Sequence, residues 1–168
     1  VDALPRYLDQ KNVDLFTSHK IYTEAEMEAR YETILEEYAK TLNIEALTMS
    51  GMVRQDILPS VSGYIASLAE AVGSKRAVCK DLPCTAEVAL IEKLSGLMDE
   101  AYEKVNTLDT VLADGKAESH NALTAATYYK DEIIPAMESL RAVVDQMEVD
   151  TSSDFWPYPS YGDLMFRV

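Results

Sequence analysis

The chain has 168 residues, of which 48% are hydrophobic and 26% are charged, and its formal net charge is −14. This composition fits one globular domain and excludes a membrane-spanning segment, because no apolar run approaches the ~20 residues that a span requires. The acidic balance argues against nucleic acid as a partner, since phosphate binding needs concentrated Lys and Arg. Only six Gly and six Pro are present, so we expect a helical domain.

The first part of the chain, residues 1–22, is predicted to be a lead-in segment. It contains a short helix around residues 10–18 that presents Val13, Leu15 and Phe16. Thr23 and Glu26 then have the spacing of a capping box, in which the hydroxyl and the carboxylate each satisfy a free backbone N–H. A long helix is therefore predicted to begin directly after Thr23.

This long helix is predicted over residues 24–73. Its apolar or small residues recur at close to the helical period. They are Met27, Tyr31, Ile34, Tyr38, Leu42, Ala46, Met49, Val53, Ile57, Val61, Ile65, Leu68 and Val72. Pro59 interrupts the pattern and predicts a kink or a break in the preceding turn. Gly73 and Ser74 are expected to end the helix.

A loop over residues 74–84 is predicted next, with Thr85 as a candidate cap for a second long helix at 85–114. Gly115 is placed to terminate that helix. Its apolar residues alternate steps of three and four, the spacing of a helix packed lengthwise against near-parallel partners. They are Ile91, Leu94, Met98, Ala101, Val105, Leu108 and Leu112.

A third long helix is predicted over residues 118–149. Its apolar face comprises Leu123, Ala126, Ile133, Met137, Leu140, Val144 and Met147. Lys130 falls where one member of this face would lie, so that layer should be near an edge of the core or let the amine reach water. Asp56–Ser60 resembles Glu132–Ala136, which predicts two similar proline kinks. Residues 23–150 are thus predicted to form an all-α bundle of three long antiparallel helices.

The C-terminal tail, residues 151–168, differs from the rest in character. Pro157 and Pro159 forbid a helix and favour an extended path. Five aromatic residues bury more area than a solvated tail would, so the tail should be docked. They are Phe155, Trp156, Tyr158, Tyr161 and Phe166. We expect the tail to pack along the N-terminal half of the first long helix, with Trp156 substantially buried.

Chemistry-bearing motifs are scarce. A carboxylate-bridged metal site in a bundle needs Glu-x-x-His pairs, and neither His19 nor His120 has a Glu three residues before it. The glutamates at 24, 26, 28, 32, 36 and 37 are better explained as a solvated helix face. Asn43 and Glu45 lie among apolar residues, where a carboxylate needs a partner, and a structural contact is favoured over catalysis. No phosphate-binding Gly-rich loop or nucleophile–base pair is present.

The two cysteines, Cys79 and Cys84, could bind a metal or form a redox pair, but C-x4-C lacks the tight spacing and the second pair of a zinc site. Two free thiols in a reducing compartment are favoured, and a cytoplasmic location is expected. We predict no catalytic, cofactor-binding or metal-binding residue in this chain. The chain starts with Val1 rather than Met, and we expect a piece of a longer protein.

Several segments resemble one known family. They are Ala29–Glu32, Leu35–Thr41, Asn43–Ala46, Met52–Val53, Asp56–Pro59 and, most specific of all, the tail Trp156–Leu164. Together they resemble the C-terminal region of type III glutamine synthetases, the large bacterial form of that enzyme. The resemblance spans nearly the whole chain. The loop at 74–84 and the turn near 115 contribute little to it.

The resemblance implies that this chain is the helical C-terminal extension of a much longer subunit. In that family the upstream domains bind ATP, Mg or Mn, glutamate and ammonia, and the subunits form stacked hexameric rings. No catalytic motif of the family matches a position here, so the resemblance implies that the isolated chain binds no ATP and makes no glutamine. The role implied is structural, assembly-related or regulatory. A free-standing acidic interaction module and a small metal-carboxylate enzyme are the alternatives.

Overall fold

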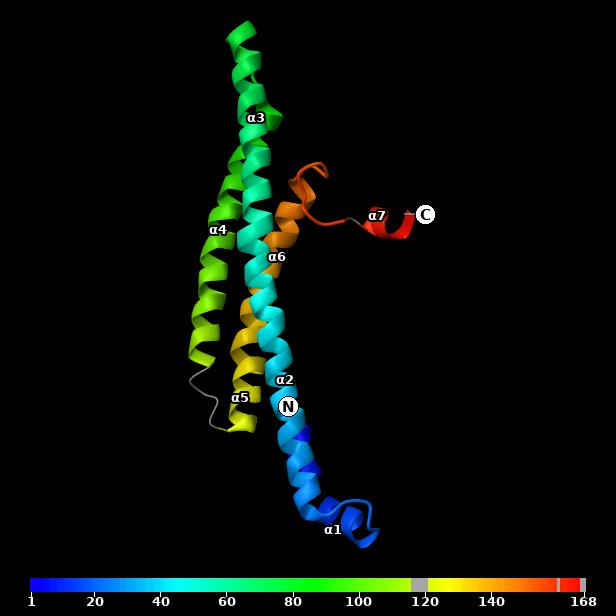
Figure 1. Cartoon of the computed structure of the whole chain (residues 1–168). Helices are drawn as coiled ribbons and strands as arrows, with labels where there is room; N and C mark the ends of the chain where they lie inside the picture. The colour runs from blue at the N-terminus through cyan, green and yellow to red at the C-terminus, as the bar shows by residue number, and fades with distance from the viewer. Residues whose placement is uncertain (116–120, 160, 167–168) are drawn as a thin grey trace. The chain divides into compact units, whose positions relative to one another are not determined.

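The computed structural model describes residues 1–115, 121–159 and 161–166, and within these ranges every regular element is helical. The predicted all-α class is confirmed. The elements in chain order are η1 Leu4–Leu8, α1 Gln10–Ser18, α2 Glu24–Met52, η2 Val53–Ile57, α3 Leu58–Val78, α4 Thr85–Gly115, α5 Ala122–Tyr128, η3 Tyr129–Ile133, α6 Ile134–Asp150 and α7 Tyr161–Phe166 (Figure 1). Of the helices in the described ranges, none is both long and apolar enough to cross a membrane.

The chain divides into two compact units. The first unit combines Val1–Leu47 with Leu108–Met137, and the second unit combines Thr48–Thr107 with Glu138–Val168. Each unit therefore contains segments that are far apart in the sequence.

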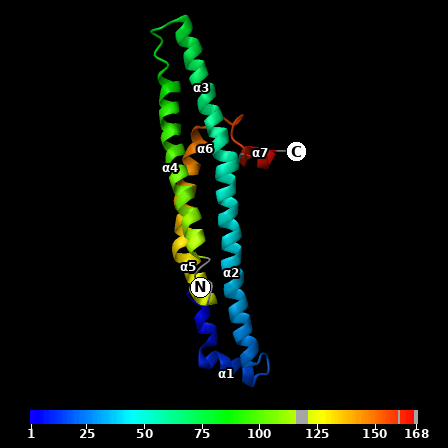
Figure 2. The same cartoon turned by 60° about the vertical axis from the view of Figure 1, so that its left-hand side comes forward.

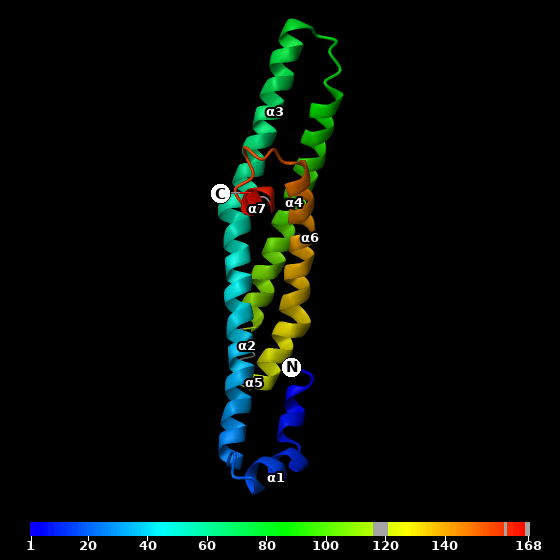
Figure 3. The ribbon, with the colours of Figure 1, turned by 90° about the vertical axis from the view of Figure 1, so that its right-hand side faces the viewer.

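The first unit begins with η1, which is followed by α1, whose bounds are those predicted from the sequence. A short turn leads into α2 (Figure 3), and the predicted capping box is present at its start. The Thr23 backbone N–H donates to Glu26 Oε2 at 2.7 Å, and the Glu26 N–H donates to Thr23 Oγ1 at 3.3 Å. The Thr23 N–H also holds the pKa of Glu26 below its usual value of 4.5. The reciprocal bonds satisfy donors that a helix start otherwise leaves free.

The core of the first unit joins α2 to the end of α4 and to α5 and η3. Its buried residues are Val13, Met27, Leu35, Ala46, Leu108, Leu112, Ala126, Tyr129 and Ile133. The Tyr128 hydroxyl donates to the Val111 carbonyl at 3.0 Å, which links α5 to α4. Gly115 makes this approach possible, since a Cβ there would lie 2.9 Å from Tyr128 Cε1.

In the second unit, α3 and α4 lie side by side (Figure 2). Lys75 of α3 forms an ion pair with Glu87 of α4 near the loop that joins these two helices. Arg54, which lies in η2, donates from Nη2 to Asn106 Oδ1 of α4 at a distance of 2.7 Å. An ion pair between Lys93 and Asp150 joins α4 to α6. The buried residues of this unit are Val53, Ile57, Val61, Cys84, Leu94, Leu97, Ala101, Val105, Leu140, Val143 and Met147.

Each mid-helix proline follows a π-helical turn. Pro59 follows η2 and Pro135 follows η3, and both occupy the first turn of the next α-helix. Proline lacks an N–H and its ring clashes with the carbonyl four residues earlier, so a regular α-helix cannot run through it unchanged. A wider turn places the Leu58 N–H on the Val53 carbonyl five residues back. The interruption predicted near Pro59 is confirmed in position, and its form is a π-helical turn.

Two predicted helix boundaries are wrong. The first long helix does not end at Gly73 but continues through Val78, because one glycine in a helix interior costs only about 1 kcal/mol. The loop therefore shortens to Cys79–Cys84. Thr85 is the first helical residue rather than the cap, since the Cys84 carbonyl accepts from the Val88 N–H at 3.0 Å.

One predicted core position is wrong, and the layer of Lys130 is occupied by its neighbour. Ile34 is 48% exposed, whereas Leu35 is buried and lies three helical turns before Ala46 on the same face. In η3, Tyr129 rather than Lys130 occupies the buried layer. Lys130 instead reaches Asp2 at 2.6 Å, so the predicted exposure of this amine is confirmed. The start of the third long helix predicted at residues 118–120 lies outside the described residues.

Candidate functional site

A polar cleft of about 670 Å³ lies in the first unit. Residues of α2 form one wall at the three- and four-residue spacing that places side chains on one helix face. The end of α4 and the start of the α5–η3 segment form the other wall. The lining residues are Glu32, Glu36, Ala39, Lys40, Asn43, Gly115, Asn121, Ala122, Ala125 and Tyr129.

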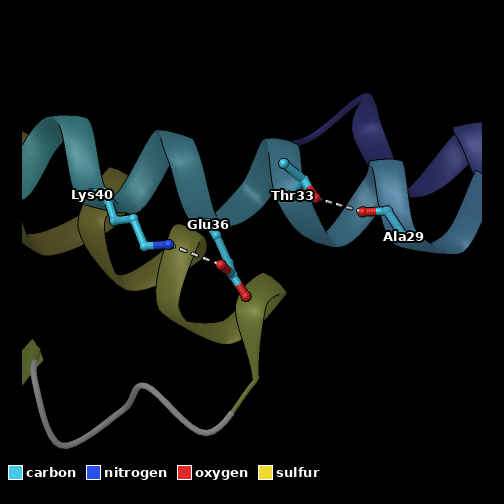
Figure 4. A network of polar contacts seen from close by, with 4 residues as sticks. All are labelled: Ala29, Thr33, Glu36 and Lys40. Carbon is cyan, nitrogen blue, oxygen red and sulfur yellow. Dashed lines mark hydrogen bonds and ion pairs between the residues drawn. The ribbon is translucent and has the colours of Figure 1, made fainter.

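The charged groups of the cleft lie on α2. Lys40 Nζ donates to Glu36 Oε2 at 3.0 Å, and both side chains are more than half exposed. Figure 4 shows this pair in front of the ribbon of α5, with Thr33 donating its hydroxyl to the Ala29 carbonyl one turn earlier. An exposed pair of this kind contributes well below about 1 kcal/mol to stability. The pair is a solvated charge pair rather than a buried catalytic one.

The floor of the cleft contains a hydrogen bond between η3 and α2. The Tyr129 hydroxyl donates to Asn43 Oδ1 at 3.1 Å, and Tyr129 is 6% exposed. Burial raises the pKa of Tyr129, because an apolar setting disfavours the phenolate. Tyr129 is therefore a neutral donor at neutral pH. Asn43 has the structural contact that the sequence favoured.

The aromatic tail is anchored within the second unit. The Phe155 ring lies 3.7 Å from where a Gly63 Cβ would be and packs against Tyr64 at a ring separation of 5.4 Å. The Tyr158 hydroxyl donates to Asp56 Oδ2 at 2.8 Å. These contacts correct the predicted docking on the N-terminal half of α2, since the tail contacts η2 and α3. Trp156 is half-buried rather than substantially buried.

The comparisons with known proteins agree on one family. Residues 1–76 match the model of the glutamine synthetase C-terminal domain. The chain is 32% identical, over 99% of its length, to a glutamine synthetase of Butyrivibrio fibrisolvens. The chain belongs to the glutamine synthetase C-terminal domains. It is also 26% identical over 98% of its length to a type-3 glutamine synthetase of Dictyostelium discoideum, and 25% identical over 98% to a glutamine synthetase of Bacteroides fragilis.

This glutamine synthetase C-terminal domain spans about a quarter of the length of those relatives: 24%, 23% and 23%. The family implies ATP and a divalent metal in the full enzyme. Among the residues that the structure describes, no group of three or more His, Cys, Asp or Glu side chains could hold a metal ion. In the cleft, Glu36 is already paired with Lys40. The donor set of the cleft does not fit a nucleotide–metal site.

The remaining residues singled out in the sequence lie apart from the cleft. Glu45 is exposed, so its expected apolar surroundings are absent. Cys79 is exposed and Cys84 is buried, and both are free thiols. His19 is exposed at the end of α1, whereas His120 lies outside the described residues. The hydrogen bond from Tyr129 to Asn43 was not predicted from the sequence, because the helical period placed Lys130 rather than Tyr129 on the buried face.

Proposed function

We propose that this domain is the non-catalytic C-terminal part of an enzyme that joins ammonia to glutamate at the expense of ATP. The observation that carries the proposal is the 32% identity to a glutamine synthetase across 99% of a chain whose polar cleft holds only exposed charges. In this proposal the domain serves the enzyme through its shape and its surfaces. Its role is then structural, in assembly or in regulation.

In this proposal residues 23–150 form a bundle of three long antiparallel helices, with residues 1–22 as a lead-in and 151–168 as a docked tail. The second unit supports this arrangement, because Lys75 pairs with Glu87 and Arg54 with Asn106 in reverse order along the two helices. The tail contacts of Tyr158 and Phe155 support docking. A bundle of this kind is a rigid support for a neighbouring domain.

The proposed partners of the domain are other parts of the same enzyme. The upstream portion of the polypeptide holds ATP and Mg or Mn, and it packs against this domain. Neighbouring subunits complete a ring-shaped homo-oligomer in the cytoplasm. The net charge of −14 is consistent with protein partners rather than nucleic acid.

The test compares three proteins: the full-length enzyme, the same chain ending just before Val1, and residues 1–168 alone. We expect glutamine formation only from the full-length enzyme and loss of its oligomer, measured by sedimentation, in the truncated chain. Calorimetry of residues 1–168 with ATP and Mg²⁺ should show no binding heat. The proposal would be contradicted if residues 1–168 alone formed glutamine. It would also be contradicted if the full-length chain formed none.

A further inference from the structure

The short helix α7 carries a large apolar surface that its own unit leaves open. Leu164, Met165 and Phe166 are 66%, 71% and 79% exposed. Single exposed apolar side chains are ordinary, but three in succession at a helix end are a contiguous patch that normally has a partner. Figure 1 shows α7 projecting to the side of α3 and α6.

The spacing of these residues defines the shape of the surface that can cover them. Successive helical residues are turned by about 100°. Leu164, Met165 and Phe166 therefore cover roughly 200° of the circumference, and Gly162 lies between the last two of them. Asp163, the charged residue of α7, lies on the part of the circumference between Phe166 and Leu164. A helix that is apolar over more than half of its circumference fits into a groove rather than onto a flat face.

The part of the tail that precedes α7 is anchored to its unit. The Tyr158–Asp56 hydrogen bond and the packing of Phe155 on Gly63 fix the chain a few residues before α7 begins. Anchored upstream, α7 samples fewer positions than a free terminus, and less conformational entropy is lost when it docks.

We propose that α7 inserts into an apolar groove on the upstream portion of the same polypeptide, and this inference rests on the proposed function. Relatives are about four times longer than this chain, so a large protein surface lies next to the domain. Linkage in one polypeptide gives that surface a high effective concentration. Two copies of this domain would instead bring together chains of net charge −14 each, which repel.

The experiment places the photoreactive residue p-benzoylphenylalanine at position 166 of the full-length enzyme, where it replaces another aromatic residue. The matched control carries the same residue at Val149, which is 82% exposed on α6 of the same unit. We expect the Phe166 variant to cross-link to a peptide that precedes Val1, with a yield several-fold above that of the Val149 variant. Mixed assemblies, reconstituted from separately expressed ¹⁵N-labelled and unlabelled chains, should give same-label products only.

Cross-links confined to residues 1–166, mixed-label products, or a yield no higher than the control would each overturn the proposal. The same samples are assayed for glutamine formation before irradiation. This activity separates the docking of α7 from the proposed function. An enzyme that is active but gives no cross-link contradicts only the docking of α7 and leaves the proposed function in place. A cross-linked chain that makes no glutamine contradicts the proposed function and leaves the docking in place.

Discussion

Tyr129 shows how one residue joins two helical segments. Its ring is buried at a π-helical turn, and its hydroxyl donates to Asn43 on α2. A neutral hydrogen bond of this kind contributes about 1 kcal/mol. The contact therefore helps to fix α2 against η3 within the first unit.

We predict that Tyr129→Phe lowers the free energy of unfolding by about 1 kcal/mol in urea denaturation, because the ring remains and only the hydroxyl is lost. Tyr102→Phe is the matched control, since Tyr102 is 54% exposed, and it should leave stability unchanged. In the Tyr129→Phe background, Asn43→Ala should cost less than it does alone. Additive effects of the two substitutions would show that the hydrogen bond contributes nothing.

Gly115 and Gly96 lie on the same helix and should respond to alanine in opposite ways. A Cβ at Gly115 would lie 2.9 Å from the Tyr128 ring, which the hydrogen bond to Val111 holds in place, whereas a Cβ at Gly96 meets nothing within 4 Å. Gly115→Ala should cost about 1–3 kcal/mol through overpacking. Gly96→Ala should stabilise by about 0.5–1 kcal/mol through helix propensity. Thermal unfolding of both variants checks the pair, and equal signs would contradict it.

At the scale of elements, the capping box makes the start of α2 sensitive to pH. The pKa of Glu26 is lowered by the Thr23 N–H and hydroxyl in the folded state. The ionised form is thus favoured by folding, so its contribution is present above pH 4.5, the unfolded value, and is lost as pH falls through the lower folded pKa.

We predict that Glu26→Gln melts below the wild type at neutral pH and that this gap closes in acid. Thr23→Ala should cost about 1 kcal/mol at neutral pH, because the cap itself is removed. Melting curves followed by circular dichroism from pH 7 to pH 3 measure both effects. A gap that stays constant over this range would mean that the Glu26 charge does not act at the helix start.

The tail anchor should respond to alkali instead. Burial and the Asp56 carboxylate raise the pKa of Tyr158 from 10.0 to about 12. The neutral phenol is favoured by folding, so its contribution is present below pH 10 and is lost as pH rises through about 12.

We predict that Trp156 fluorescence, from the only tryptophan of the chain, shifts to the red over this range as the tail detaches. Tyr158→Phe should show the red-shifted emission already at neutral pH. Tyr102→Phe serves as the control and should keep the wild-type profile. A Tyr158→Phe spectrum identical to that of the wild type would exclude this hydrogen bond as the anchor.

The regular parts of these elements could be predicted from the sequence, because periodic burial leaves a periodic pattern. Five of the seven apolar positions predicted for α4 are buried: Leu94, Ala101, Val105, Leu108 and Leu112. Gly73 misled the prediction because glycine is tolerated inside a supported helix. The choice of Tyr129 over Lys130 depends on a π-helical turn, which has no periodic pattern of its own. The tail partner Asp56 is about a hundred residues away, and no local pattern identifies it.

For the whole molecule, the charge imbalance of 29 acidic against 15 basic residues should dominate the response to salt. The ion pairs Arg6–Asp9, Lys40–Glu36 and Arg141–Asp145 are exposed, so screening them costs little. Screening the net repulsion favours the compact state.

We predict that the unfolding midpoint in urea rises as NaCl increases from about 10 mM to 150 mM, a range over which the Debye length falls from roughly 30 Å to 8 Å. Replacing the exposed residues Glu24 and Glu28 by Gln should reduce this rise. Tyr102→Phe, which changes no charge, should leave the rise as it is. A midpoint that falls with salt would show that attractive pairs outweigh the net repulsion.

The π-helical turns also bear on how this domain is compared with its relatives. A turn bonded five residues back holds one more residue than an α-helical turn, so η2 and η3 each correspond to a single inserted residue within an otherwise regular helix. A relative without such a turn therefore has one residue fewer at that point while its buried faces stay in phase. A one-residue gap in an alignment near Pro59 or Pro135 then corresponds to a change between a π-helical and an α-helical turn, and it leaves the buried faces of the helix on either side in register.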